Sequence, residues 1–191
     1  DVVWMPSPVG HSTGYNYGLR FALYHGIPLV LQDTWSAKDA VSLISAQRCS
    51  YTLAATTFLQ DLVEECERTG IRLPSLTRFG CGGAPVPPDL VVAAERVGIG
   101  VLRLYGSTEG LVITWNRPGG PRDRLRNTDG PPISHVEIRI CDDEGAPCPA
   151  GTMGEVLVRG PNTCQGFYAD PKRTAAAFDA EGWLRTGDLG R

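Results

Sequence analysis

Short apolar segments alternate with helical patterns through the first half of the chain, and this alternation restricts the fold more than any other feature. Strand-like segments are Val2–Met5, Pro28–Leu31, Tyr51–Ala54, Thr77–Cys81 and Val101–Tyr105. The helical segments between them are Tyr15–His25, Ala37–Gln47, Phe58–Thr69 and Pro88–Val97. Because a helix between two strands forms a βαβ crossover, the order predicts an α/β fold with a parallel sheet over residues 1–114.

In a parallel sheet of this kind, ligands bind beyond the carboxyl ends of the strands. This rule selects segments that each follow a predicted strand: Ser7–Gly14, Ala55–Phe58, Gly82–Pro85 and Gly106–Gly110. We therefore expect a ligand site at that edge of the sheet.

The pattern changes after Thr114. Residues 116–132 are rich in Arg, Pro and Gly and are expected to form a loop. Further strands are predicted at Val136–Cys141, Glu155–Arg159 and Trp183–Arg185, with a short helix at Pro171–Phe178 that Asp170 can cap. The prediction for residues 115–191 is a β-rich, distorted barrel-like subdomain.

Composition excludes some classes of function. The net charge of −3 argues against a nucleic-acid partner. The six cysteines lack the close spacing of a zinc or redox motif, which fits a reducing cytoplasm. No apolar run reaches the roughly 20 residues of a membrane span. The chain starts at Asp1 inside an apolar strand and ends at Arg191 after a Gly-Asp turn, so both ends are expected to be internal to a longer protein.

The segment from Tyr105 to Gly110, Tyr-Gly-Ser-Thr-Glu-Gly, has the most distinctive composition in the chain. Glycines let a backbone approach a ligand closely. Adjacent Thr108 and Glu109 suit phosphate and its magnesium ion, and Tyr105 offers a flat face to a base. A Gly-rich turn with a solvated Glu109 fits these residues equally well.

Two other segments are weaker on their own. Gly82-Gly83-Ala84-Pro85 could line the edge of a purine, although a plain tight turn is favoured. In Thr186-Gly187-Asp188, the carboxylate could accept hydrogen bonds from ribose hydroxyls, although a hairpin turn is the more ordinary interpretation.

The order of these motifs resembles the superfamily of acyl-CoA synthetases, peptide-synthetase adenylation domains and luciferases. The motifs are Gly-Gly-Ala-Pro from Gly82, Tyr-Gly-Ser-Thr-Glu from Tyr105, the run Gly154–Gly160, Gly-Phe-Tyr from Gly166 and the run Gly182–Asp188. The likeness covers nearly the whole chain. It implies an internal part of the large N-terminal domain of an AMP-forming acyl-CoA synthetase.

The resemblance implies a role for each matching residue. Tyr105 would stack on adenine, and Gly82, Gly83, Ala84 and Pro85 would line its other side. Gly106 and Ser107 would bind the nucleotide, Thr108 would touch the phosphate, Glu109 would hold Mg²⁺, and Asp188 would bind the ribose. His11 would lie between the acyl carboxylate and the phosphate, so His11, Thr108 and Glu109 are the candidate catalytic residues. By position, Val9, Tyr15, Thr56, Gly82 and Leu111 are candidate walls of an apolar acyl pocket.

The implied reaction has two steps. A carboxylic acid reacts with ATP to give an acyl-adenylate and pyrophosphate, and coenzyme A, a substrate, then displaces AMP. The resemblance also implies that Tyr105, Gly83, Glu109 and Asp188 converge on one cleft.

Some expected parts of the family pattern do not occur between Asp1 and Arg191: the phosphate loop ending in Lys, the Arg after the Asp188 region, and the C-terminal domain with its catalytic Lys. Neither lysine of the chain, Lys38 or Lys172, has a suitable motif. We therefore expect the 191-residue chain alone to be inactive.

Other functions stay open. An adenylation domain that loads a carrier-protein thiol usually has an Asp after the aromatic or His at the His11 position; Ser12 follows here, which favours a simple carboxylate. A non-catalytic nucleotide-binding module would fit the missing parts. A serine hydrolase is not among them, because it needs Ser at the centre of Gly-x-Ser-x-Gly and Ser107 directly follows Gly106. The acid itself and the oligomeric state cannot be read from the sequence.

Overall fold

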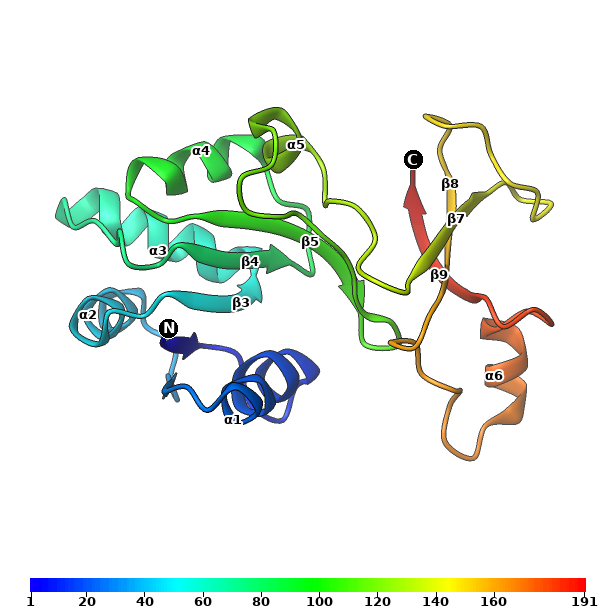
Figure 1. Cartoon of the computed structure of the whole chain (residues 1–191), viewed down its shortest axis with the longest axis horizontal. Coiled ribbons are helices and arrows are strands. Elements are labelled where there is room, and N and C mark those ends of the chain that lie inside the picture. Colours follow the sequence, from blue (N-terminus) through cyan, green and yellow to red (C-terminus); the bar gives the residue numbers. More distant parts are fainter. The chain divides into compact units, whose positions relative to one another are not determined.

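A computed structural model describes residues 1–191 and contains a six-stranded sheet (Figure 1). Its strands are β1 (Val3–Met5), β2 (Leu29–Leu31), β3 (Tyr51–Ala55), β4 (Arg78–Gly82), β5 (Val101–Ser107) and β6 (Leu111–Trp115), in the order β2-β1-β3-β4-β5-β6. The pairs β1–β2, β1–β3, β3–β4 and β4–β5 are parallel. The predicted α/β class and parallel sheet are confirmed.

Helices connect the parallel strands as predicted. They are α2 (Ala37–Gln47), α3 (Thr56–Thr69) and α4 (Pro88–Arg96). Helix α2 has the predicted bounds, and the side chain of its N-cap Ser36 accepts a hydrogen bond from the Asp39 N–H at 3.2 Å. Helix α3 starts two residues before the predicted Phe58.

The first predicted helix, Tyr15–His25, is helical in the structure but is mostly not an α-helix. Residues Gly14–Arg20 form a π-helix, η1, and only Phe21–His25 form the α-helix α1. A Cβ atom on Gly18 would lie 2.7 Å from Met5 Cγ, so η1 packs directly on strand β1. Because successive side chains of a strand point to opposite faces, Met5 faces η1 while Trp4 faces the other side of the sheet.

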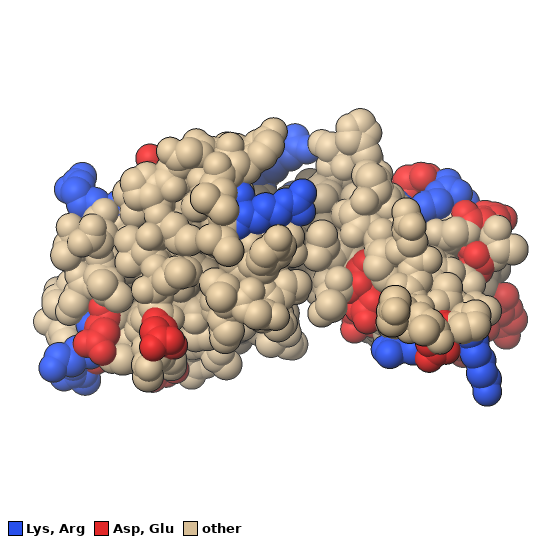
Figure 2. Space-filling model, turned by 90° about the horizontal axis from the view of Figure 1, so that it is seen from below, with Lys and Arg blue, Asp and Glu red and all other residues tan.

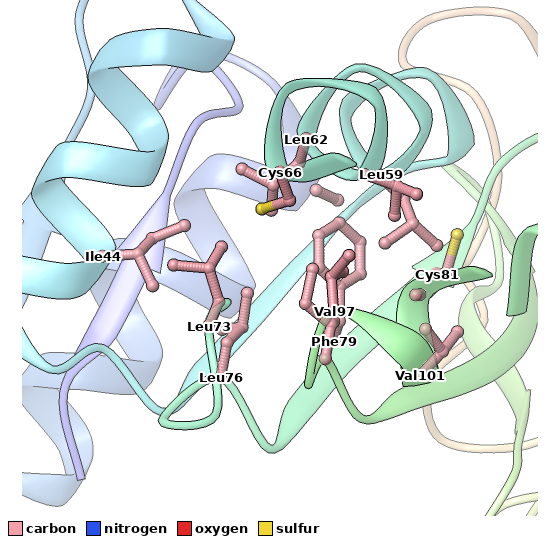
Figure 3. Packing of buried hydrophobic residues seen from close by; sticks show 14 of the residues in the cluster. Ile44, Leu59, Leu62, Cys66, Leu73, Leu76, Phe79, Cys81, Val97 and Val101 are labelled. Carbon is pink, nitrogen blue, oxygen red and sulfur yellow. The ribbon is translucent and has the colours of Figure 1, made fainter. Parts of the chain in front are cut away.

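The main core lies on the Trp4 side, between the sheet and helices α2, α3 and α4. Figure 3 shows Phe79 on β4 surrounded by Leu59 and Leu62 of α3 and by Val97 after α4, all of them buried. Phe79 also meets Trp4 edge-on, with ring centroids 6.4 Å apart. This core fixes the strands whose carboxyl ends carry the candidate site.

Thr52 is a polar side chain that lies in this sheet without a hydrogen-bond partner. Thr52 in β3 is fully buried, and its hydroxyl makes no hydrogen bond. Because valine has the same shape without the unpaired hydroxyl, Thr52→Val is expected to stabilise the chain by about 1 kcal/mol. Denaturant unfolding would measure the change, with the exposed Thr57→Val as the matched control, and a destabilised Thr52→Val would contradict the expectation.

Two elements were not predicted. Strand β6 follows β5 after a three-residue connection, which is long enough for an antiparallel neighbour but not for a parallel crossover. Helix α5 (Arg122–Asn127) lies inside the segment predicted as loop. The Arg103 side chain of β5 holds this region, donating to the Arg126 carbonyl at 2.6 Å and pairing with Asp129 at 2.8 Å.

The later part of the chain contains an antiparallel sheet of β7 (Glu137–Cys141), β8 (Gly154–Arg159) and β9 (Leu184–Gly190), in that order. Helix α6 (Pro171–Ala177) begins after N-cap Asp170, whose side chain accepts from the Arg173 N–H at 2.9 Å. The predicted β-rich character is confirmed, as an open three-stranded sheet with one short helix. Strand β9 runs well past the predicted Trp183–Arg185.

By their contacts, the residues form two compact units. The first unit is Asp1–Tyr105 with Trp115–Gly130, and the second unit is Gly106–Thr114 with Pro131–Arg191. The division of subdomains after residue 114 stays a prediction, and the contacts place residues 115–130 with the first unit.

None of the helices has the length and apolar character that crossing a membrane requires. On the face shown in Figure 2, acidic and basic side chains are interspersed, and that face has no basic stripe of the kind that binds nucleic acid.

Candidate nucleotide and acyl site

Within the first unit, the carboxyl ends of β1, β3, β4 and β5 point to one edge of the sheet, because these strands are parallel. The loop Pro6–Thr13 follows β1, Thr56 follows β3, the loop Gly83–Pro85 follows β4, and Tyr105 lies near the end of β5. The fold therefore brings candidate residues from four separate segments to the same edge.

Thr56 connects two of these strand ends. Its hydroxyl donates to the Ala84 carbonyl at 3.2 Å, and Ala55 pairs with Gly82 in the sheet register. The Thr56 side chain is buried. Thr56, proposed as an acyl-pocket wall, thus also holds the loop after β4 in place.

Gly82 and Gly83 are required for different reasons. A Cβ atom on Gly82 would lie 2.4 Å from the Leu104 carbonyl oxygen of the neighbouring strand β5. Gly83 has φ +79° with nothing within 4 Å of its Cβ position. Gly82 is therefore needed for close packing and Gly83 for its backbone conformation, and Ala84 and Pro85 follow as exposed residues.

His11 lies in an exposed loop after β1. Its N–H donates to the Pro8 carbonyl at 3.0 Å, and its carbonyl accepts from the Tyr15 N–H at 3.0 Å. Val9 and Tyr15 are exposed large side chains on either side of it, at 45% and 52%. The structure places His11, Val9 and Tyr15 on one short segment at the candidate edge.

Tyr105 is partly buried and lies one strand away from the loop after β4. Cys81, in β4 directly before the Gly82–Pro85 loop, is fully buried, and burial raises the pKa of its thiol to about 11. Cys81 is therefore a packing residue beneath the loop rather than a nucleophile.

The rest of the Tyr105 motif belongs to the second unit and forms the β5–β6 turn. The Ser107 hydroxyl accepts from the Gly110 N–H at 3.0 Å, and a Cβ on Gly106 would lie 2.0 Å from the Leu111 carbonyl oxygen. Leu111 adopts φ +50°, unusual for a non-glycine residue. Thr108 is exposed and Glu109 is partly exposed at the tip of this turn.

Cys164 and Asn162, in the segment after β8, hold this turn by hydrogen bonds. Neither residue was a candidate in the sequence analysis. The Cys164 N–H donates to the Glu109 carbonyl at 2.7 Å. The Asn162 side-chain amide donates to the carbonyls of Gly110 and Val112, at 2.5 and 3.1 Å. Neither contact leaves a periodic or local signal, because Asn162 is about fifty residues from its partners.

Asp188 lies in strand β9 and is exposed, rather than in a turn. Its N–H donates to the Thr186 hydroxyl at 3.1 Å, and that hydroxyl donates to the Val156 carbonyl at 2.8 Å. Glu155 fixes the same stretch by pairing with Arg185 at 2.5 Å. The Asp188 backbone is therefore held to β8.

The four residues expected to converge on one cleft are divided between the two units. Gly83 and Tyr105 belong to the first unit, while Glu109 and Asp188 belong to the second. Their convergence on one cleft stays a prediction.

No group of three or more His, Cys, Asp or Glu residues could hold a metal ion by itself. Glu109 offers one carboxylate, which suits Mg²⁺, since that ion is usually held by one or two carboxylates together with substrate phosphates.

The AMP-binding enzyme family matches residues 1–168 of the chain. The chain belongs to the AMP-binding enzyme family.

Members of the AMP-binding family are similar to the chain along its whole length. The medium-chain fatty-acid–CoA ligase of Escherichia coli (strain K12) is 37% identical over 191 residues, which is 100% of this chain and 34% of that ligase. The amide bond synthetase McbA of Marinactinospora thermotolerans is 35% identical with a TM-score of 0.87, covering 99% of this chain and 39% of that one.

The O-succinylbenzoate coenzyme A synthetase of Bacillus subtilis, in complex with ATP and magnesium ion, is 30% identical with a TM-score of 0.86. The match covers 99% of this chain and 39% of that synthetase. The chain thus spans about a third of the length of the curated AMP-binding relatives it matches.

Proposed function

We propose that the full-length protein carrying this sequence is an AMP-forming acid–thiol ligase that adenylates a small-molecule carboxylic acid and transfers the acyl group to coenzyme A. The observation that carries the proposal is the meeting of the Gly82–Pro85 loop, Tyr105 and the His11 loop at one edge of a parallel sheet. Several similar members of the family are named as CoA ligases.

In the first step, a carboxylate oxygen attacks the α-phosphorus of ATP, and the bond to pyrophosphate breaks. The Tyr105 ring stacks on adenine, and the glycines at 82 and 83 let the β4 loop approach the purine edge. Asp188 accepts hydrogen bonds from the ribose hydroxyls. In the second step, the coenzyme A sulfur attacks the acyl carbon and AMP leaves.

Gly106, Ser107 and Thr108 lie along the phosphates, and the Thr108 hydroxyl donates to a phosphate oxygen. Glu109 would hold Mg²⁺, which would supply positive charge to offset that of the phosphates. The partial exposure of Glu109 and the fixed backbone of its turn support this role. His11 orients the acyl carboxylate. The protein contributes mainly positioning and charge stabilisation, since ATP supplies the activation.

The acyl group lies against Val9, Tyr15, Thr56, Gly82 and Leu111. The exposed apolar surface of Val9 and Tyr15 supports an apolar acid such as a fatty or aromatic acid. We also propose a cytoplasmic location, because all six cysteines are free.

The test is ATP–pyrophosphate exchange by the full-length protein with a panel of fatty, aromatic and amino acids. Exchange that depends on an apolar acid, followed by acyl-CoA formation when coenzyme A is added, is the expected result. AMP binding without exchange for any acid would instead identify a nucleotide-binding module and contradict the proposal.

A second candidate differs only in the acceptor. The similarity to an amide bond synthetase at a TM-score of 0.87 favours testing amines beside thiols. If adenylate forms and only an amine or a carrier-protein thiol accepts the acyl group, this candidate replaces coenzyme A transfer.

A further inference from the structure

The hydrogen-bonding groups of His11 are almost fully used inside its own loop. Its backbone N–H donates to Pro8, its carbonyl accepts from Tyr15, and its Nδ1 accepts from the Thr13 N–H at 3.2 Å. Only Nε2 has no partner within the loop.

A neutral imidazole carries one proton, and the nitrogen that accepts a hydrogen bond cannot carry it. Because Nδ1 accepts from Thr13, the proton lies on Nε2. We propose that Thr13 and the π-helix η1 fix His11 as an Nε2–H donor for an anionic oxygen of the acyl carboxylate or the phosphate. The identity of the oxygen that accepts from Nε2–H rests on the proposed function, whereas the tautomer of His11 does not.

The backbone around His11 has the features of a positioning device. Helix η1 starts at Gly14, directly after Thr13, and π-helical turns are rare and frequent at functional sites. A Cβ on Gly14 would lie 2.2 Å from the Pro8 carbonyl oxygen, so the loop closes only on a glycine. The Asn16 side chain adds a hydrogen bond to the Ser12 carbonyl at 3.0 Å.

A donor suits the chemistry better than a base. A carboxylic acid with an ordinary pKa near ~4 is already ionised at neutral pH, so adenylation needs no proton removed from it. A fixed N–H aimed at an oxygen that carries negative charge orients the carboxylate and stabilises the transition state. Thr13 and Gly14 are therefore positioning residues, and His11 is the group that touches the reacting oxygens.

The tautomer is tested on the 191-residue chain by long-range ¹H–¹⁵N NMR of the imidazoles. The chain has three histidines, and the His11→Gln spectrum assigns His11 by its missing signals. We expect Nε2 to be protonated in the neutral ring. Thr13 has φ −63°, which proline can adopt, so Thr13→Pro removes the N–H that His11 Nδ1 accepts from and is expected to introduce a measurable Nδ1–H population.

Thr13→Ala keeps the N–H and is the matched control, expected to match the unchanged chain. An Nδ1-protonated ring in the unchanged chain, or the same spectrum for Thr13→Pro and Thr13→Ala, would overturn the proposal.

The role of the donor is tested in the full-length protein by pyrophosphate exchange. A Gln amide nitrogen can occupy the place of Nε2, whereas an Asn amide reaches only as far as Nδ1. His11→Gln is expected to keep exchange within about tenfold, while His11→Asn loses on the order of 10²–10³-fold, the usual effect of removing one preorganised donor.

Gly10→Ala is the control for the loop, since nothing lies within 4 Å of its Cβ position. Equal activity of the Gln and Asn variants overturns the donor role. Full exchange by His11→Ala would remove His11 from the proposed site, and the NMR result would then stand by itself.

Discussion

Glu109→Gln in the full-length protein is expected to slow acyl-adenylate formation by about 10²–10³-fold, because one charge is lost beside the phosphates. Thioester formation from preformed adenylate should slow much less, because pyrophosphate has already left by that step. The backbone of Glu109 is held by Cys164, and glutamine has the same size, so the substitution changes charge without changing the turn. Single-turnover kinetics of the two half-reactions measure both effects.

The matched control is Glu144→Gln, an exposed glutamate in the β7–β8 connection, which should leave both half-reactions unchanged. Equal losses in both half-reactions of Glu109→Gln would instead assign Glu109 a structural role in the turn. A lowered melting temperature of Glu109→Gln alone would point the same way.

The elements that the sequence predicted are those whose determinants are local. Helix α2 has the predicted bounds because Ser36 caps it and its apolar face faces the core. Helix α5 and the π-helical turn of η1, which were not predicted, depend on contacts further along the chain. Helix α5 is held through Arg103, some twenty residues earlier, and Gly18 of η1 packs on Met5 of strand β1.

The same distinction applies to the candidate site. The glycine motifs and Asp188 were proposed from the sequence because their chemistry and family resemblance are visible in short segments. Thr56 as a support of the β4 loop, and Asn162 and Cys164 as supports of the Glu109 turn, were not found. A hydrogen bond between a side chain and a remote carbonyl leaves no pattern in one sequence.

Gly82→Ala is expected to have a large effect on both stability and nucleotide binding. The added Cβ would lie 2.4 Å from the Leu104 carbonyl oxygen, a backbone atom that can move only if β4 and β5 separate at this end. Overpacking of this kind costs about 3 kcal/mol at the upper end of its usual range. Since Tyr105 directly follows Leu104, the displaced strand should also weaken AMP binding by the full-length protein.

Gly83→Ala separates the steric effect from the loss of a glycine. Nothing lies within 4 Å of its Cβ position, so only the φ of +79° opposes alanine, at a cost of about 1–2 kcal/mol. Thiol labelling provides an independent readout, because Cys81 is fully buried and burial raises its pKa to about 11. Near pH 8, Cys81 should resist labelling in the unchanged chain and in Gly83→Ala, and become reactive in Gly82→Ala as the strand end opens. If both alanine variants unfold at the same denaturant concentration and protect Cys81 equally, the close approach of β4 to β5 is not what requires glycine at position 82.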